Sequence, residues 1–167
     1  MKTIFRIFTI ISFLIIALIA TFGYKVFFKS NTSFNEDFVY VYVNSGSSQD
    51  EMISSISSYI IDIESFKKAA KTKKYLENIK AGRFIIYKGD GNNKIINSLR
   101  SKNIPLNITF NNIQTIQEFS GYISKKIEAD SISLIESFTD KNFLKSLNLS
   151  QESVLSLFLP NTYEFFW

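Results

Sequence analysis

An uncharged apolar run near the N-terminus restricts the fold of this chain more than any other feature. Residues 7–24 hold 18 residues without a charged side chain, and Lys2 and Arg6 precede them. At about 1.5 Å of rise per residue, a helix of this length nearly spans a hydrocarbon core that is about 30 Å thick. The sequence therefore predicts a cytoplasmic N-terminus and a transmembrane anchor within residues 1–28.

Two other interpretations of this segment have different consequences. A cleaved signal peptide needs a small-x-small site, but Leu18 stands where an Ala-x-Ala site ending at Ala20 would need alanine. A buried core helix fits poorly with basic residues at its first turn. We therefore favour an uncleaved anchor. Lys2 and Arg6 would hold its N-terminus in the cytoplasm and leave residues 29–167 outside.

The sequence after a polar, turn-rich linker over residues 29–37 indicates an α+β fold. Runs of β-branched and aromatic residues predict strands, and apolar residues at helical spacing predict helices. The expected strands are 38–43, 83–87 and 106–110, and the expected helices are 52–60, 63–70, 94–100, one from about 114, and a helical tail to about 147. Asp50, Asp130 and Asp140 stand where helix N-caps are expected. The chain before Pro160 is expected to become extended.

An internal repeat of strand, glycine turn and helix organises the region. Counted from Gly46 and from Gly89, apolar residues fall at the sixth, seventh and tenth positions of both copies. These residues are Met52, Ile53 and Ile56 in one copy and Ile95, Ile96 and Leu99 in the other. A degraded third copy follows strand 106–110, with Asn111 and Asn112 in place of glycine because asparagine tolerates the left-handed backbone. Chance agreement between small amphipathic helices is the competing explanation.

The composition excludes several classes of function. The chain has no Cys and no His, which excludes thiol nucleophiles, Ser-His-Asp triads and the usual zinc sites. The net charge is +4 and the lysines are scattered, so we expect no nucleic-acid partner. The stretch GDGNN is interpreted as a turn and not as a phosphate cradle. We expect no cofactor and no metal.

Four stretches together resemble the YceG-like family, the membrane-bound endolytic murein transglycosylases of the MltG type, in their Bacteroidetes form. They are FVYVYVNSGSS, KAGRFIIYKGDGNNKIINSLRS, NITFNNIQTIQEFSGYIS and LFLPNTYEFFW. The resemblance covers essentially the whole chain. Its most specific part combines the anchor, the Ala-Gly-Arg-Phe strand and the motif Pro160, Asn161, Thr162 and Tyr163.

The resemblance implies a single-pass protein of the inner (cytoplasmic) membrane, anchored through residues 7–24, with its C-terminal part periplasmic. It implies LysM-like strand–turn–helix repeats over residues 38–104. Residues 105–167 would then hold a third strand–helix unit and the start of a catalytic domain. The implied activity is cleavage between N-acetylmuramic acid and N-acetylglucosamine within nascent strands, with a 1,6-anhydro product. The implied partners are peptidoglycan glycan strands and cell-wall synthases.

The resemblance does not carry a catalytic acid onto this chain. In the family pattern the acid begins a Glu-Gly-aromatic-x-x-Pro stretch, and here Leu155 stands at that position, followed by Ser156. Glu152 and Glu164 are the nearby carboxylates, and their ordinary interpretations are a solvated helix charge and an outward-facing strand charge. The family's later Glu-rich segment is absent from these residues. We therefore expect the N-terminal portion of a longer enzyme, inactive by itself.

Two other functions stay open. A membrane-tethered LysM-like module could bind peptidoglycan and recruit synthases without catalysis. Aminodeoxychorismate lyase, a label that family members have carried, needs pyridoxal phosphate on a lysine in a cytosolic fold. The predicted anchor gives that activity no support.

Overall fold

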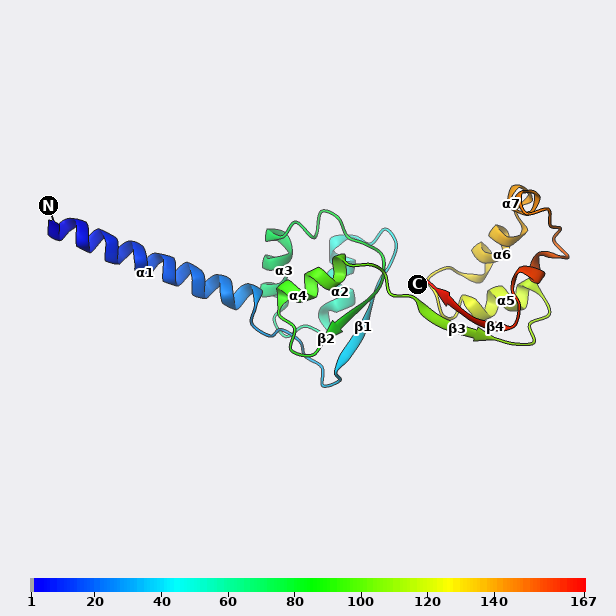
Figure 1. The fold of residues 1–167 in the computed structure, drawn as a ribbon, viewed down its shortest axis with the longest axis horizontal. Coiled ribbons are helices and arrows are strands. Elements are labelled where there is room, and N and C mark those ends of the chain that lie inside the picture. The colour runs from blue at the N-terminus through cyan, green and yellow to red at the C-terminus, as the bar shows by residue number, and fades with distance from the viewer. Residues whose placement is uncertain (1) are drawn as a thin grey trace. The chain divides into compact units, whose positions relative to one another are not determined.

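The computed structural model describes residues 2–167, which form two compact α+β units (Figure 1). Unit 1 ends at Lys102, and unit 2 runs from Asn103 to Trp167. Unit 1 contains α1 (Lys2–Phe27), β1 (Phe38–Val43), α2 (Gln49–Ser57), α3 (Ile63–Thr72), β2 (Gly82–Tyr87) and α4 (Asn92–Arg100). Unit 2 contains β3 (Leu106–Phe110), α5 (Ile116–Ile123), α6 (Ser131–Thr139), α7 (Lys141–Ser146), the 3-10 helix η1 (Val154–Leu157) and β4 (Asn161–Phe165). The predicted α+β class is confirmed.

Helix α1 is apolar and exposed along most of its length. Its segment Ile4–Phe27 is long and apolar enough to cross a membrane. The hydroxyls of Thr9 and Thr21 donate to helix carbonyls three or four residues earlier, each at 2.9 Å. Bonds of this kind satisfy the polar groups that a bilayer would leave without water. By length and composition, α1 is suited to span a membrane.

The core of unit 1 is built on the antiparallel pairing of β1 with β2. The register runs from Phe38 opposite Tyr87 to Val43 opposite Gly82. Alternate residues of both strands are buried, as the two-residue period of a strand requires. The core side chains that these strands and the helices α2, α3 and α4 contribute are Val41, Val43, Met52, Ile56, Phe66, Ala69, Ala70, Phe84, Ile86, Ile95, Ile96 and Leu99.

The first two copies of the predicted repeat fold together and not as separate modules. Their strands pair with each other, and their helices share one core. The strand of the third copy, β3, instead pairs with β4 in unit 2. The turns do adopt the predicted left-handed conformation, with φ of 72° at Gly46, 83° at Gly89 and 55° at Asn112. The turns of the three copies therefore share one backbone conformation, whereas strand pairing decides how the copies are arranged.

The helix caps agree with the prediction in part. Asp130 and Asp140 cap α6 and α7 as expected. Asp50 is not the cap of α2, because Ser48 takes that position and its hydroxyl accepts from the backbone N–H of Glu51. The Glu51 carboxylate accepts in return from the Ser48 N–H at 2.7 Å, so two free backbone donors are satisfied together. The Ser48 N–H and the Ser48 hydroxyl, which also donates to this carboxylate at 2.8 Å, lower the pKa of Glu51.

Unit 2 is organised around aromatic side chains on one face of the β3–β4 sheet. Phe119 of α5 is fully buried. Its ring stacks on Phe158 at a centroid distance of 4.1 Å and meets Phe110 of β3 edge-on at 5.0 Å. Phe138 of α6 adds a fourth ring, 5.1 Å from Phe158. This cluster fixes the segment that precedes β4.

Tyr75 is the largest fully buried side chain among the described residues. Its hydroxyl has no hydrogen-bond partner within the described part of the chain. Burial raises the pKa of Tyr75 to about 12, although the nearby Arg100 guanidinium acts in the opposite direction. A buried hydroxyl without a partner keeps its desolvation cost and gains nothing in return.

Replacing Tyr75 by Phe is expected to raise the free energy of unfolding by about 1 kcal/mol at pH 8, because the unpaired hydroxyl is removed. The pKa in the folded chain lies above the ordinary value of 10.0, at about 12. Ionisation of Tyr75 therefore leaves the free energy of unfolding unchanged below pH 10. The free energy of unfolding falls as the pH rises from 10 toward 12, because the tyrosine ionises in the unfolded chain before it ionises in the folded one. Tyr75→Phe should lose less stability over that interval than the native chain.

Urea unfolding at pH 8 and pH 11, in detergent, measures both effects. Tyr87→Phe is the matched control, since Tyr87 is 52% exposed and its replacement should change little. A Tyr75→Phe chain that is less stable at pH 8 and equally alkali-sensitive would contradict the prediction.

Candidate functional site

The motif Pro160–Tyr163 leads into β4 and secures that strand against the rest of unit 2. Asn161 is the first residue of β4 and lies opposite Phe110. The ring of Tyr163 stacks on Phe110 at 5.2 Å with an interplanar angle of 5°. Its hydroxyl donates to the Leu159 carbonyl at 3.0 Å. These residues of the motif therefore hold the start of the strand in place.

The opposite face of the same sheet is polar. Thr162 lies opposite Thr109, and their hydroxyl oxygens are 2.7 Å apart. Tyr122 of α5 donates its hydroxyl to the Thr109 carbonyl at 2.7 Å. Glu164 lies on the same face as Thr162, opposite Asn107, and is exposed. Glu164 is thus an outward-facing strand residue.

Leu155, the position that the family pattern aligns with an acid, lies in partly buried apolar surroundings. It belongs to η1, is half-buried, and packs against the core of unit 2. A carboxyl group in such surroundings has a raised pKa, which lets it hold a proton near neutral pH. Leucine has no proton to donate. The apolar surroundings are present at this position, and the acid is not.

Glu152 does not lie on a helix as predicted. It is exposed in a turn over residues 151–153. The turn forms because Ser150 and Ser153 bond to each other, with the Ser150 N–H donating to the Ser153 hydroxyl at 2.9 Å. Part of the stretch before Pro160 departs from the expected extended form, because residues 154–157 make one 3-10 turn that buries Val154. The chain leaves helical geometry at Phe158, just before the proline. Neither Glu152 nor Glu164 is enclosed by apolar side chains.

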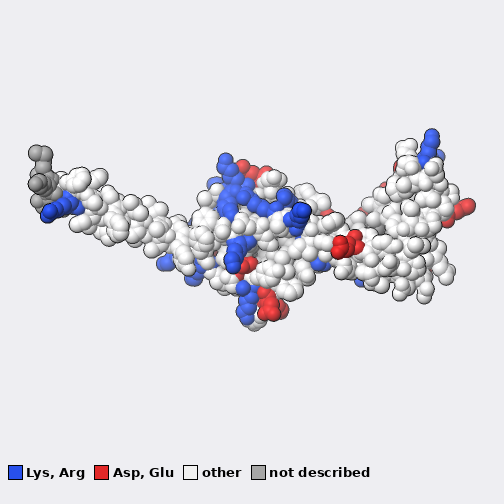
Figure 2. Space-filling model, viewed as in Figure 1, with Lys and Arg blue, Asp and Glu red and all other residues white. Residues whose placement is uncertain are grey.

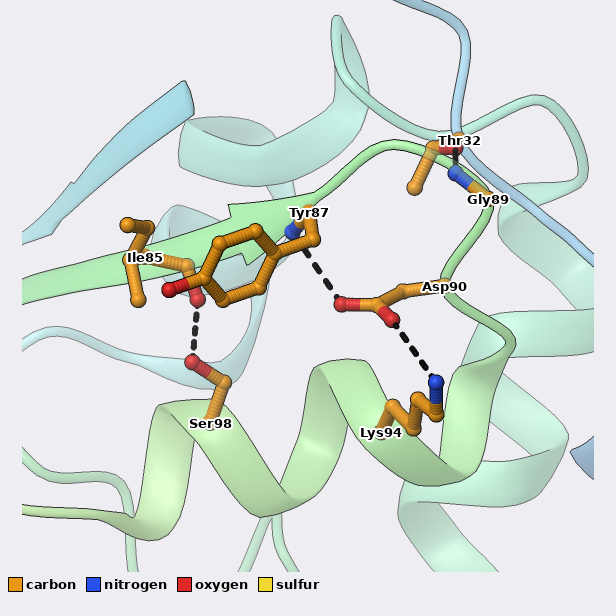
Figure 3. Close-up of polar contacts among 7 residues, drawn as sticks. All are labelled: Thr32, Ile85, Tyr87, Gly89, Asp90, Lys94 and Ser98. Carbon is orange, nitrogen blue, oxygen red and sulfur yellow. Dashed lines mark hydrogen bonds and ion pairs between the residues drawn. The ribbon is translucent and has the colours of Figure 1, made fainter. Parts of the chain in front are cut away.

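The buried carboxylate among the described residues is Asp90, which stabilises a turn of unit 1 (Figure 3). It accepts from the Tyr87 N–H at 3.1 Å and lies 3.6 Å from the Lys94 ammonium. In the same turn, the Gly89 N–H donates to the Thr32 hydroxyl at 2.8 Å. Within residues 2–167, no three His, Cys, Asp or Glu side chains are placed to hold a metal ion.

A pair of buried asparagines, which the sequence pattern did not single out, joins the end of α1 to the core. The Asn92 side-chain amide donates to the Val26 carbonyl, and its oxygen accepts from the Asn31 amide, both at 2.7 Å. The Val26 carbonyl is one of the last four of α1, which have no partner within the helix. Next to it, a Cβ on Gly91 would lie 2.8 Å from the Phe28 backbone, so glycine is required there.

A groove of about 290 Å³ lies between α2 and α3. Its lining residues are Gln49, Asp50, Ile53, Lys67, Lys68, Lys71 and Leu76. Figure 2 shows Lys and Arg side chains gathered over the region of α3. The groove therefore combines apolar side chains with ammonium donors, a combination that suits a ligand with both an apolar face and hydrogen-bond acceptors.

These observations define an α+β protein with a helix suited to span a membrane. The profile of the YceG-like family matches residues 41–167. Because this range is more than half of the sequence, the chain belongs to the YceG-like family.

A YceG-like protein from Listeria monocytogenes, known from a 2.6 Å crystal structure, is similar at 17% identity and a TM-score of 0.45. The match covers 78% of this chain and 48% of the Listeria chain, so this chain spans about half the length of that relative. No curated protein matches the sequence.

Replacing Asn92 by Ala is expected to lower the free energy of unfolding by about 2 kcal/mol, because the Val26 carbonyl and the Asn31 amide lose a buried partner. Asn93→Ala is the matched control. Its side chain accepts from Lys73 at 2.7 Å on a half-exposed surface, and its loss should cost less. Urea unfolding of the two variants in detergent makes the comparison, and equal losses would contradict the role of Asn92.

Proposed function

We propose that this chain is the membrane-proximal part of an endolytic peptidoglycan lytic transglycosylase. One observation carries the proposal: a YceG-like region follows closely on a helix suited to span a membrane. On this proposal α1 crosses the inner membrane once, with its N-terminus in the cytoplasm. Both units then act on nascent glycan strands on the other side, where cell-wall synthases are the proposed partners.

The proposed reaction needs a single group that acts first as acid and then as base. It protonates the glycosidic oxygen between N-acetylmuramic acid and N-acetylglucosamine, and the bond from C1 to that oxygen breaks. The 6-hydroxyl of the muramic acid sugar bonds to C1 and returns its proton to the group, which closes a 1,6-anhydro ring without water. Such a group requires a raised pKa in apolar surroundings.

The described residues favour a tethering and glycan-holding role for this chain. Leu155 occupies the position expected for the acid, and Glu152 and Glu164 are exposed. We propose that residues 38–104 form a LysM-like region, in which β1, α2, α3 and β2 follow one another as strand, helix, helix and strand. The groove between α2 and α3 is then the proposed contact with the glycan.

We expect purified residues 1–167, in detergent, to release no 1,6-anhydro ends from sacculi. The reason is that neither candidate carboxylate lies in apolar surroundings. Glu152→Gln and Glu164→Gln should behave like the native chain, and an active lytic transglycosylase serves as the positive control. Release by the native chain that Glu152→Gln or Glu164→Gln abolishes would overturn this assignment and identify the acid.

A non-catalytic peptidoglycan-binding or scaffold module is the second candidate function, which the lysine-lined groove favours. The native chain in detergent should be retained on insoluble peptidoglycan. Replacing Lys67, Lys68 and Lys71 by Gln should weaken retention by about tenfold, because charged donors to the ligand are lost. Replacing Lys125, Lys126 and Lys145 of unit 2 by Gln is the charge-matched control. Weaker retention of the groove variant alone supports binding of peptidoglycan through the groove, and equal loss in both triple variants would contradict it.

A further inference from the structure

A mixed basic and apolar surface surrounds the end of α1 in unit 1. Lys25 lies in the last turn of α1, and Lys29 follows four residues later, just beyond the end of the helix. Ile61, between α2 and α3, is 68% exposed, more than any other large apolar side chain described in unit 1 outside α1. Together with Ser30, Asn31, Asp62 and Ser65, these three side chains line a pocket of about 110 Å³.

The position of Ile61 is fixed relative to the end of α1. The Ile61 N–H donates to the Asn31 carbonyl at 3.1 Å. The Asn31 side chain also bonds to the backbone of Asp62 in both directions, at 2.7 Å and 2.9 Å. Because Asn31 is 5% exposed and is bonded to Asn92, the loop that carries Ile61 is held beside the residues that leave the helix.

A single exposed isoleucine is ordinary on a protein surface. Ile61 differs because of its neighbours, two lysines and the end of a helix suited to span a membrane. Tyr24 and Phe28, which are 64% and 60% exposed, add aromatic rings of the kind that gather at membrane interfaces. Such a set, with apolar tips beside ammonium groups, fits the boundary between headgroups and acyl chains.

The charge of this surface favours an anionic lipid. Lys25 and Lys29 contribute two positive charges, and Asp62 contributes one negative charge to the same pocket. The Asp62 carboxylate already accepts from the Ser65 N–H at 2.9 Å as the N-cap of α3. A positive excess therefore remains at this surface, and it favours the negatively charged phosphate of a lipid headgroup.

We propose that Lys25, Lys29 and Ile61 form a docking surface for anionic phospholipid headgroups in the leaflet where α1 ends. Ile61 inserts at the headgroup boundary, and the two lysines bind the phosphates. This inference rests on the proposed membrane anchoring of α1 and goes beyond it, because it lays a second, separate part of unit 1 on the lipid. The groove between α2 and α3 is then carried at a set height above the membrane.

The test uses the absence of Cys from the native sequence. A single Ile61→Cys in the full chain is labelled with an environment-sensitive fluorophore. The chain is then placed in phosphatidylcholine vesicles with and without phosphatidylglycerol. Nitroxide-labelled lipids should quench the label, and more strongly with phosphatidylglycerol. Adding Lys25→Gln or Lys29→Gln should lower the ratio of docked to undocked label about fivefold for each lysine removed.

Two further cysteines separate the possible outcomes. Asn44→Cys, at the end of β1 away from Asn31, should stay unquenched, and Leu14→Cys in α1 should be quenched in both lipids. Quenching at Leu14 without quenching at Ile61 overturns the docking surface alone. Quenching at Ile61 that is the same with and without phosphatidylglycerol, and the same in the lysine variants, overturns the preference of the docking surface for anionic lipid. An unquenched Leu14 overturns the anchoring and the docking together, whereas the proposed action on peptidoglycan is judged separately by the sacculus experiments.

Discussion

The antiparallel pairing of β1 with β2 is the interaction on which unit 1 depends. It brings Val41 opposite Phe84 and places every second residue of both strands against the helices α2, α3 and α4. The pairing also brings the turn after β2 to the segment that leaves α1, where the Asn31 N–H donates to the Asp90 carbonyl at 2.9 Å. The end of α1 and the helices that line the groove thus share one core with this strand pair.

The junction with α1 rests on polar groups that are buried and paired. The last carbonyls of a helix have no partner within the helix. The Asn92 side-chain amide donates a hydrogen bond to one of them, the Val26 carbonyl. Because unpaired buried polar groups cost free energy, the network favours one arrangement of the helix end over others. The Ile61 loop is part of the same arrangement, so the end of α1 and the proposed lipid contact have a common structural basis.

Unit 2 places Leu155 and the two nearby carboxylates in different surroundings. Its aromatic core and η1 place Leu155 among apolar side chains, where a carboxyl group would hold its proton. Glu152 and Glu164 lie on solvated surfaces. Family membership and the apolar helix α1 are therefore the features of this chain that bear on its function, and neither exposed carboxylate has the apolar surroundings that would raise its pKa.

Much of the local structure could be predicted from the sequence. The apolar run of α1, the limits of β1 and β3, the caps at Asp130 and Asp140 and the left-handed turn at Asn112 follow from periodicity and from backbone preferences over a few residues. The sequence also pointed to the YceG-like family, which the family profile bears out. Where two local signals competed, as at Asp50 and Ser48, the reciprocal bond to Glu51 decided the cap.

Only the tertiary structure decided which distant parts meet. Asn31 and Asn92 are 61 positions apart, and no local sequence pattern predicts that their side-chain amides are hydrogen-bonded to each other. The repeat likewise could not show whether its strands would pair with each other or with β4. The sequence by itself determined the elements, because these depend on interactions between near neighbours. The single core of unit 1, the junction with α1 and the surroundings of Leu155 depend on burial and strand register, which only the folded chain defines.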